Sequence, residues 1–380
     1  MEVTKLSINL KNKSQKYLTQ YGAVILINKN NIVENSNIIS NKCNNNLITP
    51  VIKANAYGIG AISYTKILID CGYKSFFLGN IAEGLEIRKK YKNINIYILN
   101  CGYPLNITCL KKYNLTPVIN NLEDLIIWSK YSTKKYPCIV HIDTGMNRLG
   151  IKLKHIKDSL NKKYFSKINI KFIMSHFACA EDKRNPMNDK QLNALKNCTR
   201  LLNIITKKQI KSSICNSSGI WLGNKYLLDI VRPGAALLGI NPTLNKNNPV
   251  KEAISIYAQI TQIRNVSKNS TIGYGKTITL KKDSRVATIS IGYSNGFSRL
   301  LSNIGDVYIN KNKLKILGRV SMDLTIIDIS QFKENEIKNG DTVEIFGPNR
   351  SLADFSKMNK TIPYEILCKM GKNIPKIILT

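Results

Sequence analysis

The sequence of 380 residues predicts an α/β protein in which an N-terminal (β/α)₈ barrel of TIM type is followed by a mostly β C-terminal domain. Three observations predict it. From about residue 23 to residue 250, short apolar segments alternate with longer segments of helical periodicity. Polar residues follow several of the apolar segments, as they do at the mouth of a barrel. After Pro249 the segments become short and are separated by Gly, Asn and Ser turns.

The strands predicted in the first part are rich in Val, Ile and Phe and lack strict alternation, which is typical of strands covered on both faces. They are Ala23–Ile27, Thr49–Lys53, Ser75–Gly79, Asn95–Leu99, Pro117–Asn120, Cys138–Ile142, Ile170–Ser175, Ser212–Cys215 and Leu228–Val231. Helices are predicted over Ile62–Cys71, Ala82–Tyr91, Leu122–Tyr131 and Asp189–Thr206. A doubly wound sheet is the main alternative. The barrel is favoured because several different strands end at polar residues: Lys53, His141 to Asp143, His176, Asn216 and Arg232.

The second part predicts strands over Ala253–Arg264, Arg285–Ile291, Asp306–Ile309, Lys313–Leu317, Leu324–Ile329 and Asp341–Ile345, with a late helix over Ile362–Met370. We therefore expect three divisions: an N-terminal extension over 1–22, a barrel over 23–252 and a β domain over 253–380. The extension either adds a strand to the β domain or is mobile.

The formal charge is strongly positive, because 57 Lys and Arg stand against 24 Asp and Glu. Such a balance is compatible with a nucleic-acid or anionic-membrane partner. However, 47 of the cations are Lys, only 10 are Arg, and the Arg residues form no cluster of the kind that reads nucleic acid. We interpret the charge as a solvated surface of biased composition, and expect no nucleic acid and no membrane as partner.

The nine cysteines are scattered, and no two form a Cys-x-x-Cys pair. This pattern is typical of reduced thiols in a cytoplasmic protein, and we predict no metal site. The first twenty residues lack the apolar core of a signal peptide, and no stretch approaches the ~18 apolar residues of a membrane span.

One segment carries a strong chemical signal: Val51-Ile-Lys-Ala-Asn-Ala-Tyr-Gly-Ile-Gly60. A lysine at the mouth of a barrel is partly desolvated, which favours its neutral amine and hence Schiff-base chemistry. The small residues after Lys53 leave room for a planar cofactor, and Tyr57 is placed to reach a cofactor phosphate. The alternative for a lysine alone, a solvated charge, does not explain the surrounding motif.

Further motifs follow in order along the chain. They are Ile-Asp-Thr-Gly-Met-Asn-Arg-Leu-Gly (142–150), Met-Ser-His-Phe-Ala-Cys-Ala (174–180), Asn-Ser-Ser-Gly (216–219), Val-Arg-Pro-Gly (231–234), Ile-Gly-Tyr-Gly (272–275), Ile-Gly-Tyr-Ser-Asn-Gly (291–296), Gly-Arg-Val-Ser-Met-Asp (318–323) and Thr-Ile-Pro-Tyr-Glu (361–365). With the Lys53 motif, they resemble the alanine racemase family of barrel-type pyridoxal-phosphate enzymes from about Ala23 to Pro375.

The resemblance implies pyridoxal 5'-phosphate as cofactor and the interconversion of L- and D-alanine, which supplies D-alanine for peptidoglycan. Inverting Cα requires a base on each face of the substrate. The resemblance assigns these bases to Lys53 and Tyr274, with His176 and Arg232 favouring the phenolate of Tyr274. It also implies that Arg232 faces the pyridine nitrogen. Because arginine only donates, the ring nitrogen stays unprotonated and the cofactor is a weak electron sink, which favours a racemase over an aminotransferase.

The resemblance also implies the binding residues. The cofactor phosphate is implied to be bound by Tyr57, Ser217, Tyr364 and the backbone N–H groups of Gly234 and Ala235. Arg148 is implied to contact the cofactor's phenolic oxygen and the substrate carboxylate, Met322 to offer that carboxylate a backbone N–H, Asp323 to order the loop, and Tyr293 to gate the entry path. Members of the family are homodimers with shared active sites, in which Tyr274 and Met322 reach the partner's cofactor.

Two features depart from the family. Position 141 is His, where many relatives carry a Lys that becomes carbamylated and aligns the arginine corresponding to Arg148. We therefore expect looser positioning of Arg148, or a chloride or carboxylate substitute. The chain end lacks the family's usual Arg and Tyr.

Three alternatives stay open besides an alanine racemase. A racemase of serine or another amino acid differs in only a few contacts. A non-catalytic pyridoxal-phosphate protein shares the barrel and the lysine but lacks the β domain that carries Tyr274 and Met322. A decarboxylase of the same fold type is distinguished by release of carbon dioxide.

Overall fold

The computed structural model describes residues 15–44, 46–245 and 247–379. The chain divides into two compact units. The barrel unit comprises Val33–Ala56 and Ala61–Lys251, and the β unit comprises the described residues of Met1–Ile32, Tyr57–Gly60 and Glu252–Thr380.

The barrel unit contains eight parallel strands in the spatial order β2-β9-β8-β7-β6-β5-β4-β3. They are β2 (Leu47–Ile48), β3 (Ser75–Leu78), β4 (Asn95–Ile98), β5 (Leu115–Ile119), β6 (Cys138–His141), β7 (Ile170–Met174), β8 (Ser212–Ser213) and β9 (Ile230–Val231). The sheet closes because Val51, just after β2, pairs in parallel with Phe77 of β3. Both neighbouring amides contribute: Ile52 N–H donates to the carbonyl of Phe77, and Phe77 N–H donates to that of Pro50. The predicted barrel is confirmed.

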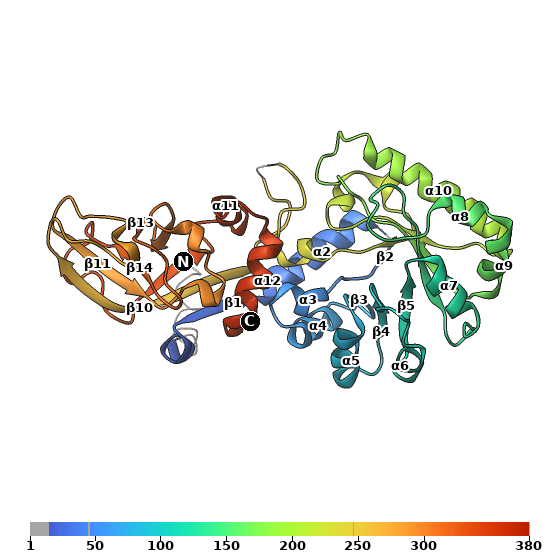
Figure 1. Ribbon diagram of the computed structural model, residues 1–380, viewed down its shortest axis with the longest axis horizontal. Helices are drawn as coiled ribbons and strands as arrows, with labels where there is room; N and C mark the ends of the chain where they lie inside the picture. Colours follow the sequence, from blue (N-terminus) through green and yellow to red (C-terminus); the bar gives the residue numbers. More distant parts are fainter. Residues whose placement is uncertain (1–14, 45, 246, 380) are drawn as a thin grey trace. The chain divides into compact units, whose positions relative to one another are not determined.

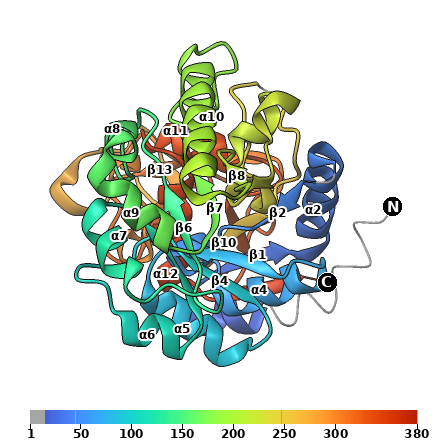
Figure 2. The ribbon, with the colours of Figure 1, turned by 90° about the vertical axis from the view of Figure 1, so that its right-hand side faces the viewer.

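Helices surround these strands (Figure 2). They are α4 (Ala61–Asp70), α5 (Ile81–Lys90), α6 (Ile107–Lys112), α7 (Leu122–Ser129), α8 (Leu153–Lys157), α9 (Ser159–Lys167) and α10 (Met187–Thr206), with the one-turn elements α3 (Lys53–Tyr57), η1 (Ser218–Trp221), η2 (Asn224–Tyr226) and η3 (Ala235–Leu238). Helix α2 (Lys29–Cys43) lies in the chain between β1 (Ala23–Asn28) and β2. Asn residues at positions 80, 106 and 121 cap α5, α6 and α7, each accepting an amide of the first turn.

Aromatic rings fill the barrel interior. The rings of Phe77 and Tyr97 meet edge to face with centroids 5.1 Å apart, and Phe172 packs against both. Val118, Ile139, Met174 and Ile230 complete this core cluster. The barrel is thus a packed core, and space for chemistry is left at the carboxyl ends of its strands.

The β unit is built on one eight-stranded sheet in the order β11-β14-β13-β12-β15-β10-β1-β16. Its strands are β1 (Ala23–Asn28), β10 (Ile254–Val266), β11 (Ser284–Ile289), β12 (Asp306–Ile309), β13 (Asn312–Leu317), β14 (Thr325–Asp328), β15 (Thr342–Phe346) and β16 (Lys376–Leu379). Helices α11 (Leu352–Met358) and α12 (Pro363–Asn373) and the short η4 (Tyr274–Lys276), η5 (Tyr293–Asn295) and η6 (Arg299–Leu301) accompany it. Of the strands of this sheet, Figure 1 labels β1, β10, β11, β13 and β14. The long β10 carries a bulge between Ile260 and Gln262. It pairs with β11 as well as with β15, so the part of the sheet that runs from β11 to β10 closes into a ring.

The placement of Ala23–Ile27 as the first barrel strand is wrong. This segment, β1, pairs antiparallel with β10 and parallel with β16. The barrel boundary expected at residue 23 therefore moves, and β1 belongs to the β unit. The error has a physical cause: an apolar pattern shows that both faces of a strand are covered, but does not show which strands lie beside it.

The expected strand within residues 1–22 is not found in the part that the structure describes. Residues 15–21 are helical, and Leu18 packs against Val24 and Ile377 of the β unit. Residues 1–14 lie outside the described residues. The chain end, which lacks the family's usual Arg and Tyr, supplies β16.

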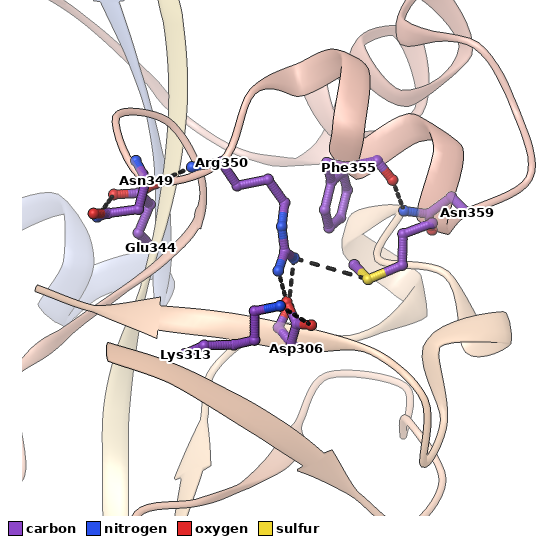
Figure 3. Close-up of polar contacts among 8 residues, drawn as sticks. Asp306, Lys313, Glu344, Asn349, Arg350, Phe355 and Asn359 are labelled. Atoms are coloured by element: carbon purple, nitrogen blue, oxygen red, sulfur yellow. Dashed lines mark hydrogen bonds and ion pairs between the residues drawn. The ribbon is translucent and has the colours of Figure 1, made fainter. Parts of the chain in front are cut away.

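A buried ion pair joins the β15–α11 connection to the sheet (Figure 3). Arg350 donates to the backbone carbonyl of Asp306 at 2.8 Å and pairs with its carboxylate, and Lys313 lies 3.6 Å from the same carboxylate. Glu344 accepts hydrogen bonds from the backbone and side chain of Asn349. These contacts fix the start of α11 and thereby support α12, which packs beside it and begins at Pro363.

Candidate active site

Arg232, directly after β9, lies on top of the barrel core. Its guanidinium carbon is 5.9 Å from the centroid of the Phe77 ring, and its side chain is only 3% exposed. Its nitrogens donate to the hydroxyl of Ser213 and the carbonyl of Ser175. Burial lowers the pKa of Arg232 to about 10, so the group is still a cation at neutral pH.

His176 lies beside Arg232, as the sequence predicts. A guanidinium nitrogen of Arg232 is 3.5 Å from Nδ1 of His176. Arginine has no acceptor, so Nδ1 accepts and the ring proton is on Nε2. Burial and the cations of Arg232, Arg148 and Lys53 hold the pKa of His176 well below its usual range. His176 is therefore a neutral imidazole that keeps an N–H available on the side away from Arg232.

His141, which ends β6, is near the same two cations as His176: Arg232 and Arg148. His141 is 8% exposed, and its Nδ1 is 2.8 Å from Oδ1 of Asn120. The amide of Asn120 donates to the carbonyls of Leu99 and Val118, which fixes its oxygen as the acceptor. His141 therefore carries its proton on Nδ1. Burial, assisted by the cations of Arg232 and Arg148, lowers the pKa of His141 to about 4.

Arg148 is exposed at the end of a loop that folds around Asp143. The carboxylate of Asp143 accepts the amides of Gly145 and Asn147, at 3.0 and 3.1 Å. The Gly150 amide then donates to the carbonyl of Asn120. The loop is thus tied to the residue that holds His141. Looser positioning of Arg148, or a chloride or carboxylate substitute, stays a prediction.

The low pKa of His141 predicts a pH-dependent stability. As the pH falls below 6.5, the unfolded chain gains a proton on residue 141 that the folded protein does not bind, so the free energy of unfolding decreases. His141→Gln lacks this effect. We expect its stability deficit relative to wild type to shrink by about 2 kcal/mol from pH 7 to pH 5. Urea unfolding of both proteins at the two pH values measures it. A deficit that stays constant would mean that folding does not lower the pKa of His141.

Lys53 begins a left-handed turn. Ala54, Asn55, Ala56 and Tyr57 all have φ between 53° and 57°, a conformation that costs about 1–2 kcal/mol per residue for side chains with a Cβ. The turn is supported at both ends: Ala54 N–H donates to Glu83, and Asn55 accepts the amide of Ala61 at 2.7 Å. Such strain persists only where the surroundings enforce it, and it is typical of functional sites.

A group of hydrogen-bond donors lies at the start of η3. The hydroxyl of Ser217 accepts the amides of Gly234 and Ala236, at 3.0 and 3.1 Å, and Ala235 lies between them. The sequence predicts the amides of Gly234 and Ala235, whereas Ala236 shares Ser217 with Gly234 in the structure. All four residues are buried. Two amides converging on a hydroxyl form a polar corner suited to a phosphate group.

In the β unit, the two tyrosines predicted to bind phosphate meet each other. The rings of Tyr57 and Tyr364 have centroids 6.1 Å apart. Burial, followed by the neighbouring Tyr364 and Cys368, raises the pKa of Tyr57. Tyr57 is therefore a neutral hydroxyl at physiological pH and an available donor.

The β unit also gathers the remaining predicted residues. Ser294 donates its hydroxyl to Asp323 at 2.6 Å, and its amide donates to Met322 at 2.9 Å, so the segments of Tyr293 and Met322 are joined. Gly292 is required there, because a side chain would collide with the carbonyl of Met322. Tyr274, Tyr293 and Met322 are exposed, by 70%, 45% and 55% respectively.

Sequence reasoning missed several residues that hold this site. Ser213 ends β8 and Asn120 follows β5. An inspection of every polar residue at or near the end of a predicted strand would have found both. Gln191 of α10 donates to the carbonyl of His176 and accepts the amide of Ala178, at 2.9 Å each. Gln191 and Glu83 lie within helices and belong to no motif, so the sequence alone does not indicate their roles.

Among the described residues, no three or more His, Cys, Asp or Glu side chains gather as a metal site. Over the same residues, no helix has the length and apolar character needed to cross a membrane.

Comparison with known proteins identifies the family of the chain. The N-terminal domain of alanine racemase matches residues 27–242, and its C-terminal domain matches residues 253–378. The chain is 40% identical over 339 residues to the alanine racemase of Rickettsia bellii (strain RML369-C), covering 88% of this chain and 82% of that protein. It is 39% identical over 350 residues to that of Rickettsia rickettsii (strain Sheila Smith), covering 91% and 96%.

A solved structure is similar over nearly the whole chain. The alanine racemase of Bartonella henselae, with covalently bound pyridoxal phosphate, superimposes with a TM-score of 0.87 at 35% identity, over 94% of this chain and 99% of that one. The two family domains match consecutive parts of the chain, in the same order. The chain belongs to the alanine racemase family.

Proposed function

We propose that the protein interconverts L- and D-alanine with pyridoxal 5'-phosphate, and so supplies D-alanine for peptidoglycan. The observation that carries the proposal is the buried pair of Arg232 and His176, in which Arg232 follows β9, the neighbour of the strand β2 that precedes Lys53. The racemases of Rickettsia and the cofactor of the Bartonella henselae enzyme support it.

The residues present fit the cofactor. The buried amides and hydroxyl at Ser217, Gly234 and Ala236 suit its phosphate, with Ala235, Tyr57 and Tyr364 as further proposed contacts. Lys53 offers an amine at the mouth of the barrel, and Arg232 offers a donor to the pyridine nitrogen. When bound, pyridoxal phosphate supplies the electron-withdrawing ring that acidifies the Cα–H bond of an amino acid.

Two side chains handle the proton at Cα. Lys53 acts on one face of the substrate and Tyr274 on the other, so that one removes the proton and the other delivers one. A free phenol titrates near pH ~10 and needs help to act as a base at neutral pH. His176 provides that help by donating a hydrogen bond from its Nε2–H to the phenolate oxygen, because its Nδ1 accepts from Arg232.

Arg232 also controls which reaction follows. It has donors only, and burial has not removed its charge at neutral pH. Arg232 therefore cannot accept a hydrogen bond from a protonated pyridine nitrogen. The nitrogen then stays unprotonated, and the ring withdraws electrons less strongly than its cationic form. Arg148 is proposed to bind the substrate carboxylate together with the backbone N–H of Met322, and Tyr293 to guard the entry path.

We propose that the active unit is a symmetric dimer. Tyr274, Tyr293 and Met322 are large side chains exposed on the β unit, and the segments of Tyr293 and Met322 are joined by hydrogen bonds, which supports an interface there. In the dimer, Tyr274 and Met322 of one chain complete the site of the other.

The test is an amino-acid racemisation assay in ²H₂O with the purified, cofactor-loaded protein. We expect L-alanine to yield D-alanine that carries deuterium at Cα, because the delivered proton comes from the solvent. A higher kcat/KM for L-serine would indicate a serine racemase, and carbon dioxide release a decarboxylase. Cofactor binding without any exchange at Cα would indicate a non-catalytic carrier and refute the proposal.

A further inference from the structure

Glu83 connects two backbone segments that meet at Lys53. One carboxylate oxygen accepts the amide of Ala54, the residue after Lys53, at 2.8 Å. The other accepts the amide of Gly79, directly after β3, also at 2.8 Å. One carboxylate thus joins the segment that carries the lysine to the end of the neighbouring barrel strand.

The surroundings fix Glu83 itself. It lies in the first turn of α5, and its amide donates to the capping side chain of Asn80 at 3.0 Å. A Cβ atom at Gly79 would be 3.1 Å from Oε2 of Glu83 and 3.4 Å from Cβ of Lys53. Glycine at this position therefore lets both the carboxylate and the lysine stem approach the strand end closely.

The turn after Lys53 needs such an anchor. Four successive residues with positive φ follow the lysine, and this conformation is unfavourable for each of them. Asn55 secures the far end through the amide of Ala61, and Glu83 secures the near end through Ala54. Without Glu83, the backbone at Lys53 would lose the contact that determines where the turn begins.

We propose that Glu83 is a positioning residue for Lys53, which directs the lysine amine to the cofactor and to Cα of the substrate. This inference rests on the proposed function. A carboxylate is suited to the role because both of its oxygens accept, whereas an amide presents one acceptor and one donor to the two N–H groups.

The experiment compares Glu83→Gln and Glu83→Ala with wild type and with Glu86→Gln, an exposed control on the same helix. The first measurement uses the apoprotein. It is mixed with pyridoxal phosphate, reduced with borohydride at successive times, and digested, and the modified Lys53 peptide is quantified by mass spectrometry. We expect Glu83→Gln to slow attachment at Lys53 by roughly tenfold, Glu83→Ala to slow it further, and Glu86→Gln to match wild type.

The second measurement separates kcat from KM at cofactor saturation. Misplacing a catalytic amine lowers kcat, and we expect a roughly tenfold to hundredfold decrease with KM within threefold of wild type. Thermal unfolding of each variant is recorded beside it. If Glu83→Ala does not fold, Glu83→Gln decides.

Two results would overturn the inference: wild-type attachment rates and kcat in folded Glu83→Gln, or a kcat loss without slower attachment. Failure of the proposed function looks different, because wild type itself would then show no modification of Lys53.

Discussion

Replacing Lys53 by alanine is expected to lower the rate of alanine racemisation by more than about 10⁴-fold in both directions. Loss of a general base alone costs about 10²–10⁴-fold, and Lys53 is also the proposed point of cofactor attachment. The measurement is kcat/KM in each direction at saturating pyridoxal phosphate. Borohydride reduction should leave the cofactor on the Lys53 peptide in wild type only.

Lys66→Ala is the control, because Lys66 lies on α4, pairs with Asp70 and is mostly exposed. Its activity should stay near that of wild type. Added methylamine should restore part of the activity of Lys53→Ala, since a small free amine can take the place of the missing one. If Lys53→Ala retained more than a tenth of the wild-type rate, Lys53 would not be one of the two bases.

Mixing two inactive variants is expected to restore activity. Tyr274→Phe removes the second base and should lower kcat by about 10³-fold. If the site combines Lys53 of one chain with Tyr274 of the other, a heterodimer of Lys53→Ala and Tyr274→Phe contains one intact site. Random reassortment makes half of the dimers mixed, so about a quarter of the sites recover.

The experiment requires the two variants to be dissociated in dilute denaturant and reassembled together. Each variant reassembled alone is the control and should remain inactive. No recovery in the mixture, with heterodimers shown by differently tagged chains, would mean that both bases come from one chain. Recovery near a quarter would show the shared site directly.

Much of the fold follows from the order of apolar segments and the chemistry at their ends. Strands ending at Lys53, His141 and His176 predicted a barrel mouth, and the structure brings these residues into one electrostatic neighbourhood. The assignment of β1 failed because burial on both faces does not identify a partner strand. Pairing β1 with β10 and β16 joins segments from opposite ends of the chain, and no local pattern records such a pairing.

The supporting residues of the site were harder to predict than the reacting ones. Asn120 matters because its amide determines which nitrogen of His141 is protonated, and that depends on the carbonyls of Leu99 and Val118. Glu83 matters because the left-handed turn brings Ala54 to it. Neither contact follows from a fixed spacing of residues in the sequence, because both form only when the barrel brings the ends of neighbouring strands together.

The position of β1 has a consequence for how the protein is made. The strand leaves the ribosome more than two hundred residues before its two neighbours in the sheet, β10 and β16. Its sequence, Ala-Val-Ile-Leu-Ile-Asn, is almost wholly apolar. Until those neighbours are made it is an unpaired apolar strand, which is a site where incomplete chains can aggregate.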